Sequence, residues 1–210
     1  DIGDPRKLAD YQVRERIDIV FSICEMIGFR AREGLVPSLC EVLGIPYVLS
    51  PPDALMISLD KGLCNYQVRQ VGVPLPDWLV VSSADQLQRI AVGDIPLPCL
   101  VKPVAEGSGM GIDNTSVATC SQTLELAVDR ILSDYRQPAL VQAYLEGPEY
   151  TVGLVEHDGE VAALRPLEIQ PRKNVEHFLY DFSTKEHADE LVAFVPVTEE
   201  HLARQLESIG

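Results

Sequence analysis

Residues 102–111, KPVAEGSGMG, combine a lysine, a serine and three glycines at the end of an apolar run. Glycine has no side chain, so backbone N–H groups in such a loop can approach an anion closely. Lys102, just inside a strand, would add an ammonium held in one place, and Ser108 would add a hydroxyl donor. The loop could therefore bind phosphate groups. A plain hairpin with flexible glycines explains the same residues equally well.

The spacing of the loop differs from two common phosphate-binding motifs. A P-loop needs Gly-Lys-Ser or Gly-Lys-Thr after its glycines, and the loop lacks this sequence. A Rossmann fingerprint needs a helix after its glycines, whereas the β-like segment TSVAT follows here. The interpretation of the loop therefore depends on which other residues accompany it.

Further candidate residues lie on both sides of the loop. Lys61 falls in an expected helix, within SLDKGLCNYQ. In ALVQAYLEGPEYTVGLV, Gln142, Tyr144 and Leu145 could present backbone and apolar surface to a flat ring. Glu149 could accept hydrogen bonds from the hydroxyls of a sugar. Each also has an ordinary interpretation, as a solvated lysine, core residues or a surface charge.

The elements that would position these residues begin with an α/β unit. A helix is expected over 4–14, and the apolar runs IDIVFSI and IPYVLS predict buried strands. Between them, EGLVPSLCEVLG predicts a helix with an apolar face of Leu35, Leu39 and Val42 that ends at Gly44. This order is typical of parallel α/β structure. One helix and two strands cannot cover a parallel sheet, so we expect further chain before the first residue.

The rest of the chain predicts alternating strands and helices of α+β character. Helices are expected at 53–71, from Ser83, from Ser121 (with Leu124, Val128, Ile131 and Tyr135 on one stripe) and in VTEEHLARQLESI. Strands are expected in PLPDWLVV, PCLVKPV, TSVAT and ALVQAYL. A hairpin is expected around Asp158-Gly159. The segment LEIQPRKNVEHFLYDFSTKEHADE has an irregular pattern.

Composition excludes several partners. With 32 acidic against 17 basic residues, the net charge of −15 repels nucleic acid and anionic lipid, so we expect neither as a partner. No run approaches the ~18 apolar residues of a membrane span, and the polar start does not resemble a signal peptide. Five cysteines without C-x-x-C indicate reduced thiols in a cytoplasmic protein. The histidines have no metal-ligand spacing, so no metal-binding residues are expected in the chain.

The order of three stretches resembles the ATP-grasp superfamily, and within it the D-alanine–D-alanine ligase-like branch. The stretches are LGIPYVLS with ALMISLDKGLCNYQVRQVGVPLP, then CLVKPVAEGSGMGI, then LVQAYLEGPEYTVGLV. The resemblance runs from about Val20 to Gly210 and implies an ATP-grasp fold of α/β and α+β parts. It implies the tail of a Rossmann-like N-terminal domain at 1–54. Two α+β subdomains would follow: a lid with the glycine-rich loop at 55–142, and the first part of a C-terminal subdomain at 143–210.

The resemblance also implies roles for the candidate residues. Lys61 and Lys102 would contact the α- and β-phosphates of ATP, while Ser108 and the following N–H groups would close over the β- and γ-phosphates. The adenine and ribose would lie against the 142–149 segment, with Glu149 on the ribose. Implied catalytic residues are Lys185, Ser108 and Gly109. Implied nucleotide-binding residues are Lys61, Lys102, Glu106, Gly107, Ser108, Gly109, Met110, Gly111, Gln142, Ala143, Tyr144, Leu145 and Glu149.

The implied reaction has two steps. A carboxylate attacks the γ-phosphate of ATP to give an acylphosphate, and an amine then displaces phosphate to give an amide. The protein would supply charge neutralisation, positioning and a mobile lid that excludes water. The implied cofactors are ATP and magnesium, and the implied substrates are small amino acids or peptides. Members of the family are often dimers through the N-terminal domain, so a homodimer is one expectation.

Three departures from the family's pattern concern substrate and metal. Ile27 replaces a histidine, Arg32 and Glu33 replace a Glu-Asp pair, and Glu186 replaces a tyrosine. D-alanine is therefore not assured as substrate. Arg30 and Arg32 could bind a carboxylate or be solvated loop charges.

The family's magnesium-binding Glu-x-Asn motif is missing after Lys185. We therefore expect an internal fragment of a longer ligase, with magnesium ligands beyond residue 210. Two alternatives remain: a catalytically incomplete module that binds a nucleotide or a partner, or a ligase for a different amino acid. A third interpretation, an α/β core with no nucleotide site, predicts no binding at all.

Overall fold

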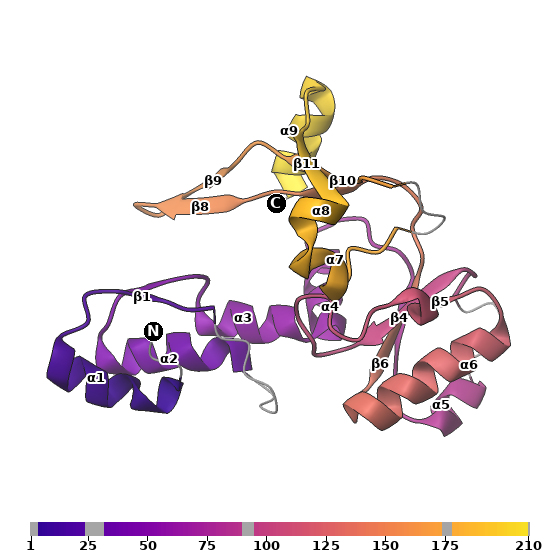
Figure 1. The fold of residues 1–210 in the computed structure, drawn as a ribbon, viewed down its shortest axis with the longest axis horizontal. Helices are drawn as coiled ribbons and strands as arrows, with labels where there is room; N and C mark the ends of the chain where they lie inside the picture. The colour runs from indigo at the N-terminus through magenta and orange to yellow at the C-terminus, as the bar shows by residue number, and fades with distance from the viewer. Residues whose placement is uncertain (1–3, 24–31, 90–94, 174–177, 210) are drawn as a thin grey trace.

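The computed structural model describes residues 4–23, 32–89, 95–173 and 178–209. Figure 1 shows three groups of elements: N-terminal helices with β1 at the lower left, a sheet with α5 and α6 at the lower right, and the C-terminal strands with α7 to α9 above them. No helix of these ranges is long and apolar enough to cross a membrane. The predicted limits of the domains, at residues 54 and 142, remain predictions.

The N-terminal group is a small parallel unit. A 3₁₀ turn at Pro5–Lys7 leads into α1 (Leu8–Glu15), and α2 (Arg32–Leu43) connects two short strands. These strands, β1 (Val20–Phe21) and β2 (Tyr47–Val48), pair in parallel as expected, although each has only two residues. The buried cluster of this unit consists of Leu8, Val36, Cys40 and Ile45.

The predicted apolar face of α2 is wrong. Val42 is 82% exposed, and the buried side of the helix carries Val36 and Cys40 instead. The reason is that α2 packs on two neighbours: Cys40 faces the α1 cluster, and Gly34 lies against α3, where a Cβ would stand 2.7 Å from the side chain of Met56. The close approach of α3 at a glycine was not visible in the apolar periodicity. Gly44 ends the helix as expected, with φ of +65°.

The single helix expected over 53–71 is two helices, α3 (Pro52–Leu59) and α4 (Lys61–Gln70). Asp60 interrupts them with an extended backbone, and its Oδ1 accepts from the N–H groups of Gly62 (3.0 Å) and Leu63 (3.1 Å). An aspartate in this position caps the second helix. Lys61 is therefore the first residue of α4, and its N–H donates to the carbonyl of Val104 at 3.0 Å.

The central group is an antiparallel sheet in the order β3-β6-β4-β5. Its strands are β3 (Trp78–Val81), β4 (Cys99–Pro103), β5 (Val117–Ala118) and β6 (Ala139–Ala143). Two helices pack on it, α5 (Ala84–Arg89) and α6 (Ser121–Arg130), and α6 continues into a π-helical turn at Ile131–Tyr135. The expected stripe on this helix is confirmed, because Val128 and Ile131 are fully buried and Leu124 and Tyr135 pack beside them.

The C-terminal group contains a sheet in the order β11-β10-β7 and a separate hairpin. Its strands are β7 (Glu149–Thr151), β8 (Leu154–His157), β9 (Glu160–Ala163), β10 (Leu167–Pro171) and β11 (Val192–Pro196). Its helices are α7 (Phe182–Glu186), α8 (Ala188–Leu191) and α9 (Glu200–Ile209). The β8–β9 hairpin turns at Asp158 and Gly159, both with positive φ, as expected. The strand β10 was not predicted, because it falls in the segment of irregular pattern.

Candidate functional site

Two cavities adjoin where the central sheet faces the segment before α7, since Lys102, Ile112 and Tyr180 line both. The first, here called the sheet cavity, has a volume of about 370 Å³ and is also lined by Leu100, Gln142, Ala143, Tyr144, Leu145, Glu149, Phe178 and Leu179. The second, here called the loop cavity, has a volume of about 280 Å³ and is also lined by Glu33, Ser58, Leu59, Lys61, Glu106, Gly107, Ser108, Gly109, Met110 and Lys185.

The structure brings together the residues predicted from the sequence. All except Gly111 line one of the two cavities, with the lysines and the glycine-rich loop around the loop cavity and residues 142–149 around the sheet cavity. Gly111 supports the path of the loop instead, because it has φ of +77° and a Cβ there would lie 2.5 Å from the ring of Pro103. The two cavities together form one elongated site with a lysine-rich end and a more apolar end.

The glycine-rich loop lies against the start of α7. Gly109 has φ of +78°, and a Cβ on this residue would lie 2.7 Å from the backbone nitrogen of Phe182 and 2.8 Å from the carbonyl carbon of Asp181. Only glycine allows this combination of left-handed backbone and close approach. The loop is thereby brought next to the helix that carries Lys185.

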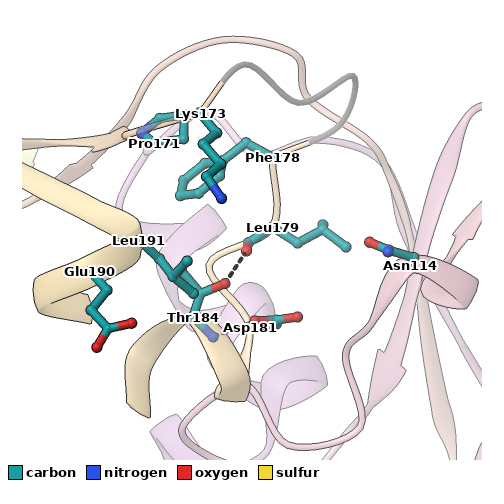
Figure 2. A pocket seen from close by; sticks show the side chains of 9 residues that line it. All are labelled: Asn114, Pro171, Lys173, Phe178, Leu179, Asp181, Thr184, Glu190 and Leu191. Carbon is teal, nitrogen blue, oxygen red and sulfur yellow. Dashed lines mark hydrogen bonds between the residues drawn. The ribbon is translucent and has the colours of Figure 1, made fainter. Parts of the chain in front are cut away.

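Local hydrogen bonds fix the start of α7. Asp181 caps the helix, with its Oδ1 accepting from the N–H of Thr184 at 2.7 Å, and its carbonyl accepts from the N–H of Lys185 at 3.0 Å. The hydroxyl of Thr184 donates to the carbonyl of Leu179 at 3.3 Å, the dashed line in Figure 2. These bonds hold the segment that forms the wall of both cavities. The Lys185 ammonium lies 5.1 Å from the centre of the Tyr180 ring.

A third cavity, of about 200 Å³, adjoins the same segment, and Figure 2 draws the side chains that line it. It shares Phe178 and Leu179 with the sheet cavity. Its other lining residues are Asn114, Pro171, Lys173, Asp181, Thr184, Glu190 and Leu191. None of the residues predicted from the sequence lines it.

The two lysines predicted to bind phosphate are partly removed from water. Burial, together with the nearby charge of Lys102, lowers the pKa of Lys61 to about 8. Burial also lowers the pKa of Lys102, while the charge of Glu149 acts in the opposite direction. Two neighbouring ammonium groups in such surroundings favour the binding of an anion, which would offset their repulsion and loss of hydration. The interpretation of Lys61 as a solvated surface residue is wrong.

The apolar end combines backbone groups with one acidic side chain. The N–H of Ala143 donates to the carbonyl of Asp77 at 2.9 Å and the N–H of Tyr144 to the carbonyl of Pro98 at 3.0 Å, so these two donors are engaged within the fold. The Tyr144 hydroxyl donates to the carbonyl of Phe178 at 3.2 Å. Burial raises the pKa of Glu149, whereas the charges of Lys185 and Lys102 lower it. Glu149 therefore interacts electrostatically with both lysines.

Comparison with known proteins decides the family. A sequence profile described as D-ala D-ala ligase C-terminus matches residues 67–209. The chain belongs to this family. D-alanine–D-alanine ligases from Aquifex aeolicus and Paracidovorax citrulli are 31% and 34% identical to it, over 87% and 77% of the chain and 58% and 46% of their own lengths. The chain thus spans about half the length of the curated relatives it matches.

Solved structures of ligases in this ATP-grasp family share the mixed α/β fold of the chain. D-alanyl-alanine synthetase A from Vibrio cholerae gives a TM-score of 0.70 at 17% identity, covering 91% of this chain and 57% of the synthetase. A D-alanine–D-alanine ligase from Bacillus anthracis complexed with ATP gives a TM-score of 0.68 at 18% identity, covering 99% and 62%. At such identities the likeness establishes the fold.

Arg32 is not a solvated loop charge, and the carboxylate that it binds is that of Glu106. Its guanidinium is neither solvated nor open to a substrate, because the residue is 5% exposed and donates to Glu106 Oε2 at 2.8 Å and to the carbonyl of Ala105 at 2.7 Å. The other carboxylate oxygen of Glu106 accepts from Gln137 at 2.7 Å. Glu106 therefore lines the loop cavity with its carboxylate engaged by the protein. Ile27 and Arg30 lie outside the described residues.

Sequence reasoning missed Gln137, Ile112 and Tyr180. Gln137 has no motif around it, and the two cavity-lining residues lie in segments without a regular pattern. The described cysteines, Cys40, Cys64, Cys99 and Cys120, carry free thiols as expected. Within the described ranges, no three His, Cys, Asp or Glu side chains cluster in a way that could hold a metal ion.

Proposed function

We propose that this protein binds ATP across the two adjoining cavities, as the nucleotide-binding part of an ATP-dependent carboxylate–amine ligase of the D-alanine–D-alanine type. The observation that carries the proposal is the arrangement of Lys61, Lys102 and the glycine-rich loop around one cavity that opens beside another lined by residues 142–149. Membership of the family supports it, and the related Bacillus anthracis ligase was solved in complex with ATP.

The proposed roles follow the two ends of the site. Lys61 and Lys102 would neutralise the α- and β-phosphates, and Ser108 with the N–H groups of Gly109 to Gly111 would close over the β- and γ-phosphates. The adenine would occupy the sheet cavity along Gln142, Ala143 and Leu145 with Tyr144 beside the ring, and Glu149 would accept from the ribose hydroxyls. Lys185 would stabilise the charge of the transferring phosphate.

The chemistry that ATP supplies is the conversion of a carboxylate into an acylphosphate, with ADP as leaving group. An amine then forms the C–N bond as the C–O bond to phosphate breaks, giving an amide and inorganic phosphate. The protein would contribute positioning, positive charge and exclusion of water by the glycine-rich loop. We assign no step to a metal bound by the described residues.

The finer parts of the proposal concern organisation and substrates. Residues 1–54 would be the end of a Rossmann-like domain, 55–142 the lid subdomain and 143–210 the first part of the C-terminal subdomain. The substrates would be small amino acids or peptides. D-alanine is one of them, and Glu186 and Ile27 are the positions at which another amino acid would be selected. We also propose a cytoplasmic location, from the cysteine usage, and keep the homodimer as a prediction.

Titration with adenylyl imidodiphosphate, a non-hydrolysable ATP analogue, tests the nucleotide site. Wild type should bind the analogue, and Lys102→Ala should bind it roughly 10- to 100-fold more weakly, because a charge-assisted contact to phosphate is lost. Equal binding by both proteins would remove Lys102 from the site. Absence of binding by wild type would favour an α/β core without a nucleotide site.

An assay of phosphate release by the full-length protein, with a panel of amino acids, tests the ligase chemistry. Amide formation from D-alanine would support the proposal in full, and amide formation only from other amino acids would favour the ligase of different specificity. Nucleotide binding without turnover on any acceptor would favour the nucleotide-binding module.

A further inference from the structure

The base of the glycine-rich loop, residues 104–106, is bonded to the protein from two directions. From α2, the guanidinium of Arg32 donates to the carbonyl of Ala105 and to the carboxylate of Glu106. From the turn before β6, Gln137 donates to the same carboxylate at 2.7 Å and accepts from the N–H of Ala105 at 2.7 Å. The N–H of Val104 donates to the carbonyl of Pro138 at 3.0 Å. The loop is therefore held in place up to Glu106.

The ion pair in this group is shielded from water. The side chain of Arg32 is 6% exposed and that of Glu106 is 18% exposed. Each carboxylate oxygen of Glu106 has its own donor, Arg32 for Oε2 and Gln137 for Oε1. A buried charge pair with both oxygens bonded has one preferred arrangement, because any displacement leaves a charge unsatisfied. These contacts hold the side chain of Glu106, and the bonds to the backbone of Val104 and Ala105 restrain the chain next to it.

Lys61 approaches the same backbone from α4. Its ammonium donates to the carbonyl of Glu106 and to that of Val104, at 3.4 Å for the latter. An ammonium has three N–H donors, and these two bonds use two of them. The position of the two carbonyls therefore sets the direction of the third donor. Lys61 and Glu106 both line the loop cavity.

We propose that Arg32, Gln137 and the carboxylate of Glu106 are positioning residues for nucleotide phosphate. They hold the carbonyls of residues 104 and 106 so that the Lys61 ammonium keeps one donor for the phosphates at the loop cavity. This inference rests on the proposed function, because it concerns the nucleotide site assigned there. Through Arg32, it also connects helix α2 of the N-terminal parallel unit to the phosphate end of the site.

Glu106→Gln gives the sharpest test, because two explanations predict opposite signs. The substitution keeps the size of the side chain but places an NH₂ group where a carboxylate oxygen faced Arg32 or Gln137. Two hydrogen-bond donors then face each other, and a bond that holds the base of the loop is lost. Binding of adenylyl imidodiphosphate should weaken roughly 5- to 30-fold. If Glu106 acts only through its charge, its removal beside a phosphate site should tighten binding instead.

Gln137→Met provides the second variant and involves no change of charge. It removes one of the two donors to Glu106 and the acceptor for the N–H of Ala105. Binding of the analogue should weaken by a similar factor. Adenosine, which lacks phosphates, should bind both variants as it binds wild type. Glu200→Gln, which breaks the exposed Arg165–Glu200 pair elsewhere, is the matched control and should change neither ligand's affinity.

Isothermal titration calorimetry on the four proteins, with thermal melting to check folding, separates the outcomes. Weaker binding of the analogue by Glu106→Gln and Gln137→Met, with unchanged adenosine affinity, supports the positioning role. Equal or tighter binding of the analogue by these variants overturns it and leaves the proposed function standing. If one variant fails to fold, the other decides. If wild type binds no analogue, the proposed function fails and this inference fails with it.

Discussion

The central sheet and the β8–β9 hairpin differ in how completely their residues are buried. Along β4 the even-numbered residues are partly buried while Cys99, Val101 and Pro103 are fully buried, and α6 covers the cluster around them. By contrast, all residues of β8 and most of β9 are exposed, and this hairpin projects away from the other elements in Figure 1. The central sheet thus has a dense core of its own, whereas the hairpin has almost no buried residues.

The difference extends to the elements that carry the site. Lys102 stands on the densely packed β4, whereas Lys185 lies on α7, which has no fully buried residue, and Glu149 lies on β7, where Glu149 and Thr151 are exposed. A residue on a rigid strand is positioned before a ligand arrives, while residues on loosely packed elements can be ordered by the ligand. The phosphate end should therefore be preformed more fully at Lys102 than at Lys185.

A matched pair of valines tests the contrast in packing and carries the largest expected effect on stability. Val101→Ala removes buried methyl groups and should lower the free energy of unfolding by about 2 kcal/mol. Val161→Ala, at a residue that is 64% exposed in β9, should change it by less than about 0.5 kcal/mol. Urea unfolding of both variants measures the two values, and similar losses at the two sites would contradict the contrast.

The pH dependence of nucleotide binding tests whether the preformed end carries a partly desolvated lysine. The pKa of Lys61 is lowered to about 8, so above that pH the free protein has a neutral amine, and affinity for the ATP analogue should fall by up to about tenfold per pH unit. Bound phosphate favours the ammonium, so the fall begins above pH 8. In Lys61→Arg the guanidinium stays charged, so the fall should become smaller and what remains should come from Lys102, whose pKa burial also lowers. An identical pH profile in both proteins would exclude Lys61 as the titrating group.

The same shift has an opposite consequence for the free protein. Because the folded-state pKa of Lys61 lies below its ordinary value of 10.5, the unfolded chain binds more protons between about pH 8 and 10.5. The contribution of Lys61 to stability should therefore rise with pH across that window, while nucleotide affinity declines.

A pair of glycines tests the contact between the glycine-rich loop and α7. The expected change in the free energy of unfolding is smaller than for Val101→Ala. Gly109→Ala introduces a Cβ 2.7 Å from the backbone of Phe182, and Gly72→Ala introduces one at a similar positive φ with no atom within 4 Å. Gly72→Ala should lower the free energy of unfolding by about 1 kcal/mol from backbone strain alone. Gly109→Ala should lower the free energy of unfolding by more than this. It should also slow turnover, because the loop moves away from α7. Thermal melting and phosphate release measure these effects. Equal stability losses and unchanged turnover would show that the contact is unimportant.

How much the sequence could predict varies between the same regions. Strong periodicity located α6 and its buried stripe, and the Asp158-Gly159 turn located the β8–β9 hairpin. The break at Asp60 was missed because the surrounding residues form good helices on either side, and only the capping bonds of Asp60 separate them. The strand β10 was missed although Leu167 and Ile169 alternate with Glu168 and Gln170, because the alternation covers only a few residues before the irregular segment begins.

The residues chosen from the sequence line the two cavities apart from Gly111, while their roles stay predictions. Local motifs and their order along the chain pointed to the residues that line the two cavities. The partner of Arg32 could not be predicted, because Glu106 lies 74 residues away and the pairing depends on how α2 packs beside the loop. Likewise, no local pattern shows that Gln137 completes the same group. Contacts between distant segments are set by packing, which sequence spacing does not encode.

The most direct test of the proposed nucleotide site is a crystal structure of the protein with adenylyl imidodiphosphate and magnesium. Phosphate oxygens should lie within about 3 Å of the ammonium groups of both Lys61 and Lys102, with the adenine in the sheet cavity. A nucleotide bound elsewhere, or phosphates that contact neither lysine, would contradict it.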